Sequence, residues 1–555
     1  MRSESMTKTI PMTIALGMLM TCPAWAQSPI PTFDKEAVTT HPYNRTGQQD
    51  VVVDDEMSDG YRPGNTGTEE DPAFYVRQIT LTGFALPDAQ GQLQEILQSY
   101  SGRSVRVSEL QELTDKITAY AKNNGYTVAQ AVVPPQEIAD GSLEIKVYVA
   151  KYDEIRVTEN TSDVADSVLE GYLHKLKAGD VMTDRNLELA MNNLNDLPGV
   201  MARAVLRPGK EAGTTAVDVQ VQDRPVWNNY VFVDNGGGYY SGRYRYGFNT
   251  EINNLSHNGD KITLSGMLSS HDVKSYSVRY ETPVGYDGTR VGIAYSQSMY
   301  ELHTNDFYNS LGKSRGISIY GMTPLYRDRM NRLTAIYGYD RRRIEDRLNF
   351  SKLFGIPEIK TEKDADVWHV GISGSQYYPN EFTQYDLIYW YGDIQSDGDG
   401  GSAPYDGVYH KLTGSVMKIW YDGPWNYRVR FQGQLANRAL DGSEQFYLGG
   451  INGVRAYGNG EGYGDAGWLG SAEIRRQTGI EGLEVAAFID AGYVNNKDFD
   501  AATEHLYGWG LGLRYSLPND WYAQLDWARK IDGRRDLSEP TDHDDRIWFQ
   551  LYKMF

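Results

Sequence analysis

Two clusters in the C-terminal half of the chain have residue types that could form a ligand site. Glycines alternate with other residues over 458–464, as in some phosphate-binding loops, but no strand–loop–helix context surrounds them, so a flexible loop is the better interpretation. The acidic segment 542–545 could bind a cation, yet an acidic tip on an outer loop explains it better. The histidines lack metal-ligand spacing, and no Ser-His-Asp or paired-carboxylate arrangement can be placed on one face. We therefore predict no catalytic site, no metal ion and no cofactor.

The composition argues against several classes of function. The 555 residues carry a net charge of -20 and no basic stripe, which argues against a nucleic-acid partner. The one cysteine, Cys22, lies in the leader predicted below, so we expect no disulfide framework and no thiol chemistry. The 41 tyrosines and 57 glycines suit a protein with many aromatic strands and tight turns.

The first 72 residues are predicted to precede the folded domains. Basic residues come before an apolar stretch over 10–20, and a small-x-small cleavage site ends at Ala26, so residues 1–26 are predicted to be a secretory signal peptide. Residues 27–72 are acidic and polar without sustained periodicity, which predicts a disordered linker. Whether this linker contains an element that plugs a pore stays open.

The next 150 or so residues contain two units with the same order of elements: strand, helix, helix, strand, strand. In the first unit we expect strands at 74–81, 127–133 and 142–149 and helices around 93–97 and 108–121. The second of these helices is predicted to begin at a capping box formed by Ser108 and Gln111. In the second unit we expect strands at 154–157, 201–206 and 216–221 and helices at 164–176 and 187–197. The pattern predicts two α+β domains, 73–150 and 151–225.

From residue 226 onward, apolar and polar residues alternate with the period of a β-strand; Tyr507, Trp509 and Leu511, for example, alternate with glycines. A membrane barrel hides its apolar face at every second position, because a lipid-exposed charge costs about 2–4 kcal/mol near the midplane. A soluble β-sandwich is the alternative, but the polar face here carries several Arg and Glu while the apolar face is rich in Tyr and Trp. We predict an all-β membrane domain over 226–555, a β-barrel of about sixteen strands.

The predicted connections differ in length on the two sides of this barrel. Short turns are expected at 378–381, 421–425, 477–482 and 517–520, and long loops at 342–366, 392–407, 437–464, 493–505 and 529–545. Short inner turns and long outer loops are the arrangement of outer-membrane barrels. In the strand 483–492, the alternation turns Phe488, Asp490 and Gly492 toward the lumen.

The end of the chain is consistent with a barrel. Phe549, Leu551 and Phe555 lie on one face of the last predicted strand. This terminus resembles the sorting signal that the barrel-assembly machinery reads, although Lys553 stands where that signal usually has an apolar residue. We therefore expect outer-membrane lipid and the assembly machinery among the partners.

Several motifs resemble those of the transporter (TpsB) members of two-partner secretion systems, the hemolysin-activator family, over residues 73–555. They are Val133-Pro134-Pro135-Gln136 followed by Asp140-Gly141; Asp234-Asn235 and Gly238; Asn253-Asn254-Leu255 and Gly259-Asp260; Gly449-Gly450 and Val454-Arg455-Ala456-Tyr457; and Phe488-Ile489-Asp490-Ala491-Gly492. The family's version of the arginine motif is Val-Arg-Gly-aromatic. Ala456 departs from it, so the backbone there must avoid positive φ.

The resemblance implies an outer-membrane barrel preceded by two periplasmic POTRA domains, with loop 437–464 folded back into the lumen. It also implies that Arg455 meets Asp490 and that Gly492 leaves room for the loop. A charge pair in a narrow lumen is physically reasonable. The residues alone leave open that Arg455 is an exposed loop arginine and Asp490 a solvated carboxylate.

The function implied by the resemblance is secretion of an unfolded partner exoprotein, of adhesin or cytolysin type, from the periplasm to the cell surface. The POTRA domains would capture the client, and the arginine loop would gate the pore. Two alternatives stay open. A factor that inserts barrels into the membrane shares the arginine loop but more often carries additional POTRA domains. A passive porin does not need periplasmic domains, and a barrel enzyme would need a nucleophile at the outer rim.

Overall fold

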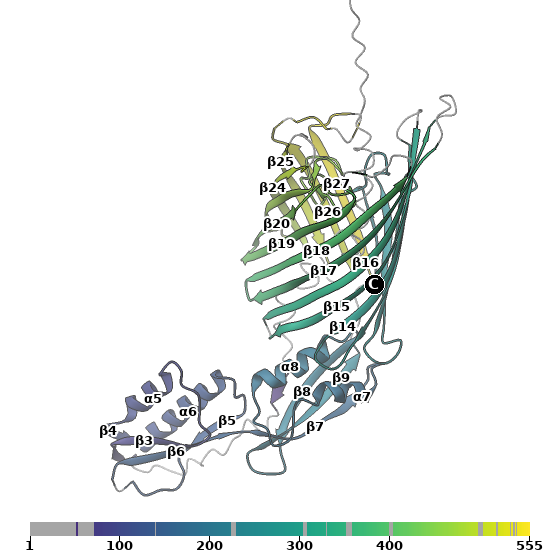
Figure 1. The fold of residues 1–555 in the computed structure, drawn as a ribbon. Coiled ribbons are helices and arrows are strands. Elements are labelled where there is room, and N and C mark those ends of the chain that lie inside the picture. Colours follow the sequence, from purple (N-terminus) through teal and green to yellow (C-terminus); the bar gives the residue numbers. More distant parts are fainter. Residues whose placement is uncertain are drawn as a thin grey trace, which may run out of the picture. The chain divides into compact units, whose positions relative to one another are not determined.

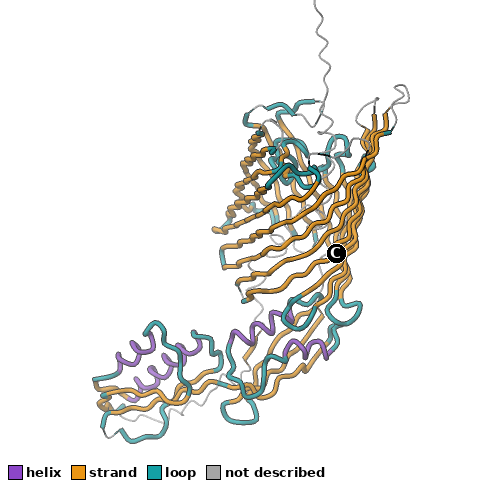
Figure 2. Tube along the Cα trace, in the orientation of Figure 1, coloured by secondary structure: helices purple, strands orange, loops and turns teal. Residues whose placement is uncertain are grey.

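The computed structural model describes residues 51–53, 71–138, 140–223, 229–303, 308–328, 330–350, 358–398, 403, 405–497, 503–517, 520–532, 534–536, 539 and 541–555. The described chain divides into two units, one ending at Arg224 and one beginning at Pro225. The predicted signal peptide, and all of the predicted linker except 51–53 and 71–72, lie outside the described residues. Every described helix belongs to the first unit (Figure 2), and none of them has the length and hydropathy needed to cross a bilayer.

The first unit begins with an α+β domain in which two helices pack against a small sheet. Strands β3, β6 and β5 form the sheet in that order, and β2 pairs with β4. Leu113 and Ile117 of the second helix share a buried cluster with Leu143 and Ile145 of β6, so the helical stripe and the strand alternation meet in one core. The elements are β2 (Ala73–Val76), β3 (Gln78–Gly83), α5 (Gln92–Tyr100), β4 (Arg103–Arg106), α6 (Val107–Asn123), β5 (Ala129–Val132) and β6 (Ser142–Val149).

The predicted capping box of α6 is wrong. The helix begins at Val107, and the Glu109 carboxylate accepts a hydrogen bond from the Arg106 backbone N–H at 2.8 Å. Ser108 does not cap the helix because Asp71 accepts both its backbone N–H, at 3.0 Å, and its hydroxyl, at 2.6 Å. A contact with a residue 37 positions earlier in the chain is not visible in local spacing.

The motif that starts at Pro134-Pro135 forms the connection between β5 and β6. The Gln136 amide donates to Glu144 O at 2.7 Å and accepts from Glu144 N at 2.8 Å, which ties the connection to its own following strand. Asp140 accepts a hydrogen bond from Ser142 N at 3.1 Å. Gly141 has φ +77°, and its carbonyl accepts from Arg77 N at 2.7 Å, so a side chain there would be strained. The motif therefore shapes a turn in the first domain.

The second α+β domain contains a four-stranded sheet of order β1-β8-β9-β7. Its edge strand β1 (Val51–Val53) pairs in parallel with Ala204–Leu206 of β8, so these three residues are strand and not the disordered linker that we predicted. Strand pairing at an edge uses only backbone groups, and so this contact leaves no periodicity in the sequence. The other elements are β7 (Lys151–Asn160), α7 (Asp166–Leu173), α8 (Asp184–Asn195), β8 (Val200–Pro208) and β9 (Thr214–Asp223).

The second unit is a closed antiparallel barrel of sixteen strands (Figure 1), which confirms the predicted fold class and strand number. The first strand pairs with both the second and the last, so the ladder closes and leaves no sheet edge. The strands are β10 (Tyr230–Asp234), β11 (Arg245–Asn253), β12 (Lys261–Ser269), β13 (Lys274–Pro283), β14 (Arg290–His303), β15 (Tyr308–Arg327), β16 (Asn331–Phe350), β17 (Ile359–Tyr378), β18 (Glu381–Gly398), β19 (Gly407–Asp422), β20 (Trp425–Ala436), β23 (Ala466–Gln477), β24 (Leu483–Asn495), β25 (Glu504–Ser516), β26 (Trp521–Lys530) and β27 (Asp545–Met554).

The two faces of the barrel strands follow the predicted alternation. In β24, Val485 and Ile489 are exposed on the outer face, whereas Phe488 and Asp490 are buried inside. At the last strand, Phe555 is 58% exposed and Lys553 forms an ion pair with Asp520. The charged group at position 553 therefore has a partner at the chain end.

The predicted loop 342–366 is wrong for most of its length, and the predicted loop 392–407 is wrong in its first part, because the strands run further. Arg342 still pairs in register with Ala365 across β16 and β17, and β18 continues to Gly398. On the outer face at this level, Arg343 and Asp364 form an ion pair at 2.8 Å. Outward charges are unfavourable in hydrocarbon, so this end of the sheet extends beyond the lipid layer. There the alternation of hydrophobicity stops while the hydrogen-bonded ladder continues.

Candidate functional site

The loop over residues 437–464, termed the inward loop, has a tip whose side chains are buried. It connects β20 to β23 and contains a two-stranded hairpin, β21 (Phe446–Tyr447) with β22 (Tyr463–Gly464). Arg455 is 6% exposed, and its neighbours Val454, Ala456 and Tyr457 are fully buried. Exposed loops do not bury four consecutive side chains, so this tip inserts into the barrel interior.

Two glycines shape the approach to the tip. Gly450 has φ +117°, a conformation that L side chains rarely adopt. A Cβ atom on Gly449 would lie 2.3 Å from Gly458 O, so the returning half of the loop passes directly against it. Val454 N donates to Leu448 O at 2.7 Å and closes a tight turn before the arginine. The glycines of the 458–464 run are buried here too, so the segment is packed and is not the flexible loop that we favoured.

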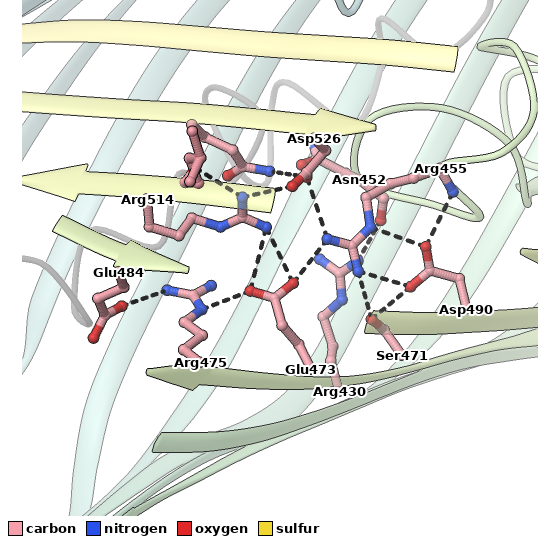
Figure 3. Close-up of polar contacts among 12 residues, drawn as sticks. Arg430, Asn452, Arg455, Ser471, Glu473, Arg475, Glu484, Asp490, Arg514 and Asp526 are labelled. Carbon is pink, nitrogen blue, oxygen red and sulfur yellow. Dashed lines mark hydrogen bonds and ion pairs between the residues drawn. The ribbon is translucent and has the colours of Figure 1, made fainter. Parts of the chain in front are cut away.

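Arg455 and Asp490 form a bidentate ion pair inside the barrel (Figure 3). Arg455 Nε lies 2.9 Å from Asp490 Oδ2, and Arg455 Nη2 lies 2.9 Å from Asp490 Oδ1. The Arg455 backbone N–H also donates to Asp490 Oδ2, at 3.2 Å. Ser471 donates its hydroxyl to Asp490 Oδ1 at 2.7 Å and so orients the carboxylate. A planar guanidinium matches a carboxylate in this geometry, whereas a lysine would make a single point contact.

Two further carboxylates contact the same guanidinium. Arg455 Nη1 lies 2.8 Å from Glu473 Oε2 and 3.3 Å from Asp526 Oδ2. Arg514 bridges these two acids from the barrel wall, at 3.1 Å from Glu473 Oε2 and 2.5 Å from Asp526 Oδ1. Arg455, Glu473, Asp490, Arg514 and Asp526 are termed the tip cluster. They come from the inward loop and from β23, β24, β25 and β26 in order, so one loop residue connects to strands spread along the wall.

Aromatic groups complete the contacts of Arg455. The guanidinium carbon lies 3.2 Å from the centroid of the Phe488 ring, a cation–π contact. Trp548 of β27 donates its indole N–H to Arg455 O at 2.6 Å. The neighbouring Tyr457 donates its hydroxyl to Asp532, and Lys530 Nζ lies 5.0 Å from the Tyr457 ring centroid. The Phe488 ring therefore covers one face of the guanidinium, and its donor groups are taken up by wall residues.

The wall provides space for the loop through glycines. A Cβ atom on Gly492 would lie 2.7 Å from Leu448 Cδ2, and one on Gly508 would lie 2.6 Å from Ala456 Cβ. Side chains at these two positions would therefore collide with the inserted loop. Ala456 is absent from the described non-glycine residues with positive φ, so the alanine adopts an ordinary backbone conformation there.

The structure brings together only part of the predicted set. The inward-loop motif, Asp490 and Gly492 meet in the lumen, as the geometry above shows. The Pro134-Pro135 motif belongs to the other unit, and Phe549, Leu551 and Phe555 belong to the last strand and its end. Asp542 of the acidic segment accepts from Lys530 Nζ at 2.8 Å, and within the described part of the chain no group of three or more His, Cys, Asp or Glu could hold a metal ion.

Sequence reasoning missed Glu473, Arg514, Asp526 and Trp548. Strand alternation was a usable signal for Arg514, which continues the polar row of the glycines at 508–512. Alternation places such residues inside the barrel but does not say which strands converge at one depth. That depends on the register of neighbouring strands, for instance Ser471 opposite Asp490.

Comparisons with known proteins agree with this architecture. A family model described as haemolysin secretion/activation protein ShlB/FhaC/HecB matches residues 213–515, and a model of the ShlB-type POTRA domain matches residues 74–149. The heme/hemopexin transporter protein HuxB of Haemophilus influenzae is 26% identical over 493 residues, 84% of each chain. The outer membrane transporter CdiB of Dickeya dadantii is 22% identical over 480 residues, 82% of each chain. The solved structure of CdiB from Escherichia coli has a similar fold, with a TM-score of 0.67 at 19% identity over 90% of this chain and 95% of that one.

The contact between Ala456 and Gly508 allows a methyl-swap test. Gly508→Ala should displace the tip of the inward loop from the lumen wall, because its methyl group would lie 2.6 Å from Ala456 Cβ. Overpacking of this kind destabilises the packed state by about 1–3 kcal/mol. The double variant Gly508→Ala/Ala456→Gly moves the methyl group from the loop to the facing strand. The loop should then return to its wild-type position. Trypsin cleavage after Arg455 measures exposure of the tip in the purified protein, and it should rise only in the single variant.

Gly470→Ala is the matched control, because the nearest atom to its added Cβ is 3.8 Å away. Equal cleavage of the single and double variants would contradict this account of the contact.

Proposed function

The chain belongs to the ShlB/FhaC/HecB family of haemolysin secretion and activation proteins, and we propose that the inward loop gates its pore while the POTRA domains capture an unfolded client. As a two-partner secretion transporter, it is an outer-membrane barrel with periplasmic POTRA domains that secretes a partner protein. The partner proposed here is an exoprotein of adhesin or cytolysin type. The outer membrane supplies no nucleotide, so folding of the client beyond the barrel is the proposed driving force.

The observation that carries the gating proposal is the buried tip cluster. Arg455 lies between three carboxylates of the wall, and Asp490 has no exposed side-chain surface. A polypeptide entering the lumen must displace this tip. Breaking one partner of a buried ion pair costs about 3–5 kcal/mol, and less in a wet lumen. That magnitude suits a gate, since it keeps the pore occupied at rest but is small enough for a client to overcome.

Strand edges in the first unit support the capture proposal. The ten-residue strand β7 ends the sheet of the second α+β domain and has one described strand neighbour, β9. At the opposite edge, β1 already adds three residues from a distant part of the sequence to β8. A client strand added at β7 would gain backbone hydrogen bonds with little demand on its sequence, which suits a client without fixed structure.

The gating proposal predicts opposite effects on current and on secretion. Arg455→Ala should raise conductance in planar bilayers, because the loop loses its ion pairs with the wall, and it should block secretion of the client. Arg455→Lys should fall between wild type and Arg455→Ala, since an ammonium cannot make the bidentate pair. Arg438→Ala, which removes a loop arginine outside the tip cluster, is the control. Normal secretion and wild-type current in the Arg455→Ala variant would rule out the gate.

Client capture by strand addition predicts protection of backbone amides. Hydrogen exchange of the full-length chain in detergent should slow within residues 153–160 of β7 when an unfolded candidate exoprotein is added. The folded exoprotein should give no such protection. Protection confined to the helices α7 and α8 would contradict strand addition.

An assembly factor is the alternative function, and depletion of the chain separates the two. Secretion predicts that one exoprotein disappears from the surface and the medium while the content of other outer-membrane barrels is unchanged. Quantitative mass spectrometry of outer membranes and medium measures both. A general loss of barrels would support the assembly factor instead.

A further inference from the structure

The inward loop makes a second set of buried ion pairs, on strands that do not contribute to the tip cluster. Asp441 and Glu444, near the start of the loop, are 2% and 4% exposed. Lys363 Nζ lies 2.7 Å from Asp441 Oδ2, and Lys411 Nζ lies 2.7 Å from Glu444 Oε2. Arg342 donates a further hydrogen bond to Glu444.

Asp346 completes this set. Its carboxylate lies 3.3 Å from Lys363 Nζ and accepts a hydrogen bond from the Tyr300 hydroxyl. The loop residues Asp441 and Glu444, together with the wall residues Arg342, Asp346, Lys363 and Lys411, are termed the root cluster. Three cations face three carboxylates in it. Without the two loop carboxylates, the wall residues would keep three cations and one carboxylate, a buried excess of positive charge that is unfavourable.

The root and tip clusters lie on different arcs of the barrel. The root cluster uses β16, β17 and β19, and the tip cluster uses β23, β24, β25 and β26. In the closed order of strands, β20 separates the two arcs on the near side, and β16 and β26 are eight steps apart in either direction. The root cluster also lies near the end of β16 that extends beyond the lipid, at the level of the outward Arg343–Asp364 pair.

The two clusters use opposite charges of the loop. At its start the loop supplies carboxylates to a cationic part of the wall, and at its tip it supplies a guanidinium to an acidic part. Gly449 and Gly450 lie between the two contact points and make a tight turn in the chain. The two sets of ion pairs share no residue, so separation of one set does not in itself break the other.

We propose that the inward loop is held at two points, and that Asp441 and Glu444 are positioning residues whose ion pairs must also break before the lumen clears. The inference rests on the proposed gating function and deepens it. Release of the tip cluster alone leaves the start of the loop across the outer part of the lumen. Full opening requires the root cluster to separate as well.

Single-channel recordings of the full-length purified chain in planar bilayers test the two-point attachment without a client. The variants are Asp441→Asn/Glu444→Gln at the root, Arg455→Ala at the tip, and all three substitutions together. Each cluster should hold the loop on its own, so the root and tip variants should each give a partial rise in open time. The combined variant should exceed either by roughly tenfold, as expected when the second of two independent restraints is removed.

Glu362→Gln/Asp364→Asn is the matched control. Like Asp441→Asn/Glu444→Gln, it removes two negative charges. Both lie on β17, in ion pairs that are exposed on the outside of the barrel. Heat-modifiability on a gel reports whether the double variant folds. If it does not, the single variants Asp441→Asn and Glu444→Gln, each of which removes part of the root cluster, replace it in the test. They should each give a smaller rise than the double variant.

The outcomes separate this inference from the proposed gate. If Arg455→Ala opens the pore as far as the combined variant, and the root variants behave as wild type, then the two-point attachment is overturned while the gate stands. If neither the root nor the tip variants change the current, both are overturned. A rise in the root variants that adds to that of Arg455→Ala supports the attachment at two points.

Discussion

A guanidinium held in the interior of a β-barrel is the interaction on which the rest of this structure depends. Arg455 carries a full charge at any physiological pH, so its burial is tolerable only where the wall supplies carboxylates at hydrogen-bonding distance. Asp490, Glu473 and Asp526 meet that requirement from three different strands. Because β23, β24, β25 and β26 follow one another in a closed hydrogen-bonded ladder, the carboxylates cannot move apart without disturbing the barrel. The loop conformation thus follows from the wall.

Close packing around that ion pair explains why small residues stand at certain positions of the wall and the loop. Gly492 and Gly508 are needed because Leu448 and Ala456 of the inward loop occupy the space that their side chains would fill. The alanine at position 456 replaces the glycine of the family pattern, and its methyl group rests where β25 has no side chain. A loop that carries a slightly larger residue at its tip is accommodated by the absence of one on the facing strand.

The two units differ in their strand edges: the barrel has a closed ladder, and the sheets of the first unit are open. Closure of the barrel pairs β10 with β27 and removes every edge from the part that crosses the lipid, where unpaired backbone groups are unfavourable. The sheets of the first unit stay open, and one of them already has an added strand, β1, at one edge. Open edges in an aqueous compartment are suited to binding extended chains, and closed ladders are suited to enclosing a path for them.

Much of this organisation could be predicted from the sequence, because it depends on local periodicity. The alternation of apolar and polar residues specifies strands, their outward faces and the number of strands, and it correctly turns Phe488 and Asp490 inward. The same rule failed where β16 and β17 extend past the lipid, since outward charges such as Arg343 resemble a loop in sequence. The capping of α6 failed for a related reason, because Asp71 lies far from Ser108 in the chain. Tertiary structure alone decided which lumen residues meet: Glu473, Arg514 and Asp526 are brought to Arg455, and Lys363 to Asp441, by the register and closure of the barrel. Register is a sum of many pairings along the ladder, whereas sequence periodicity reports only the face on which each side chain lies.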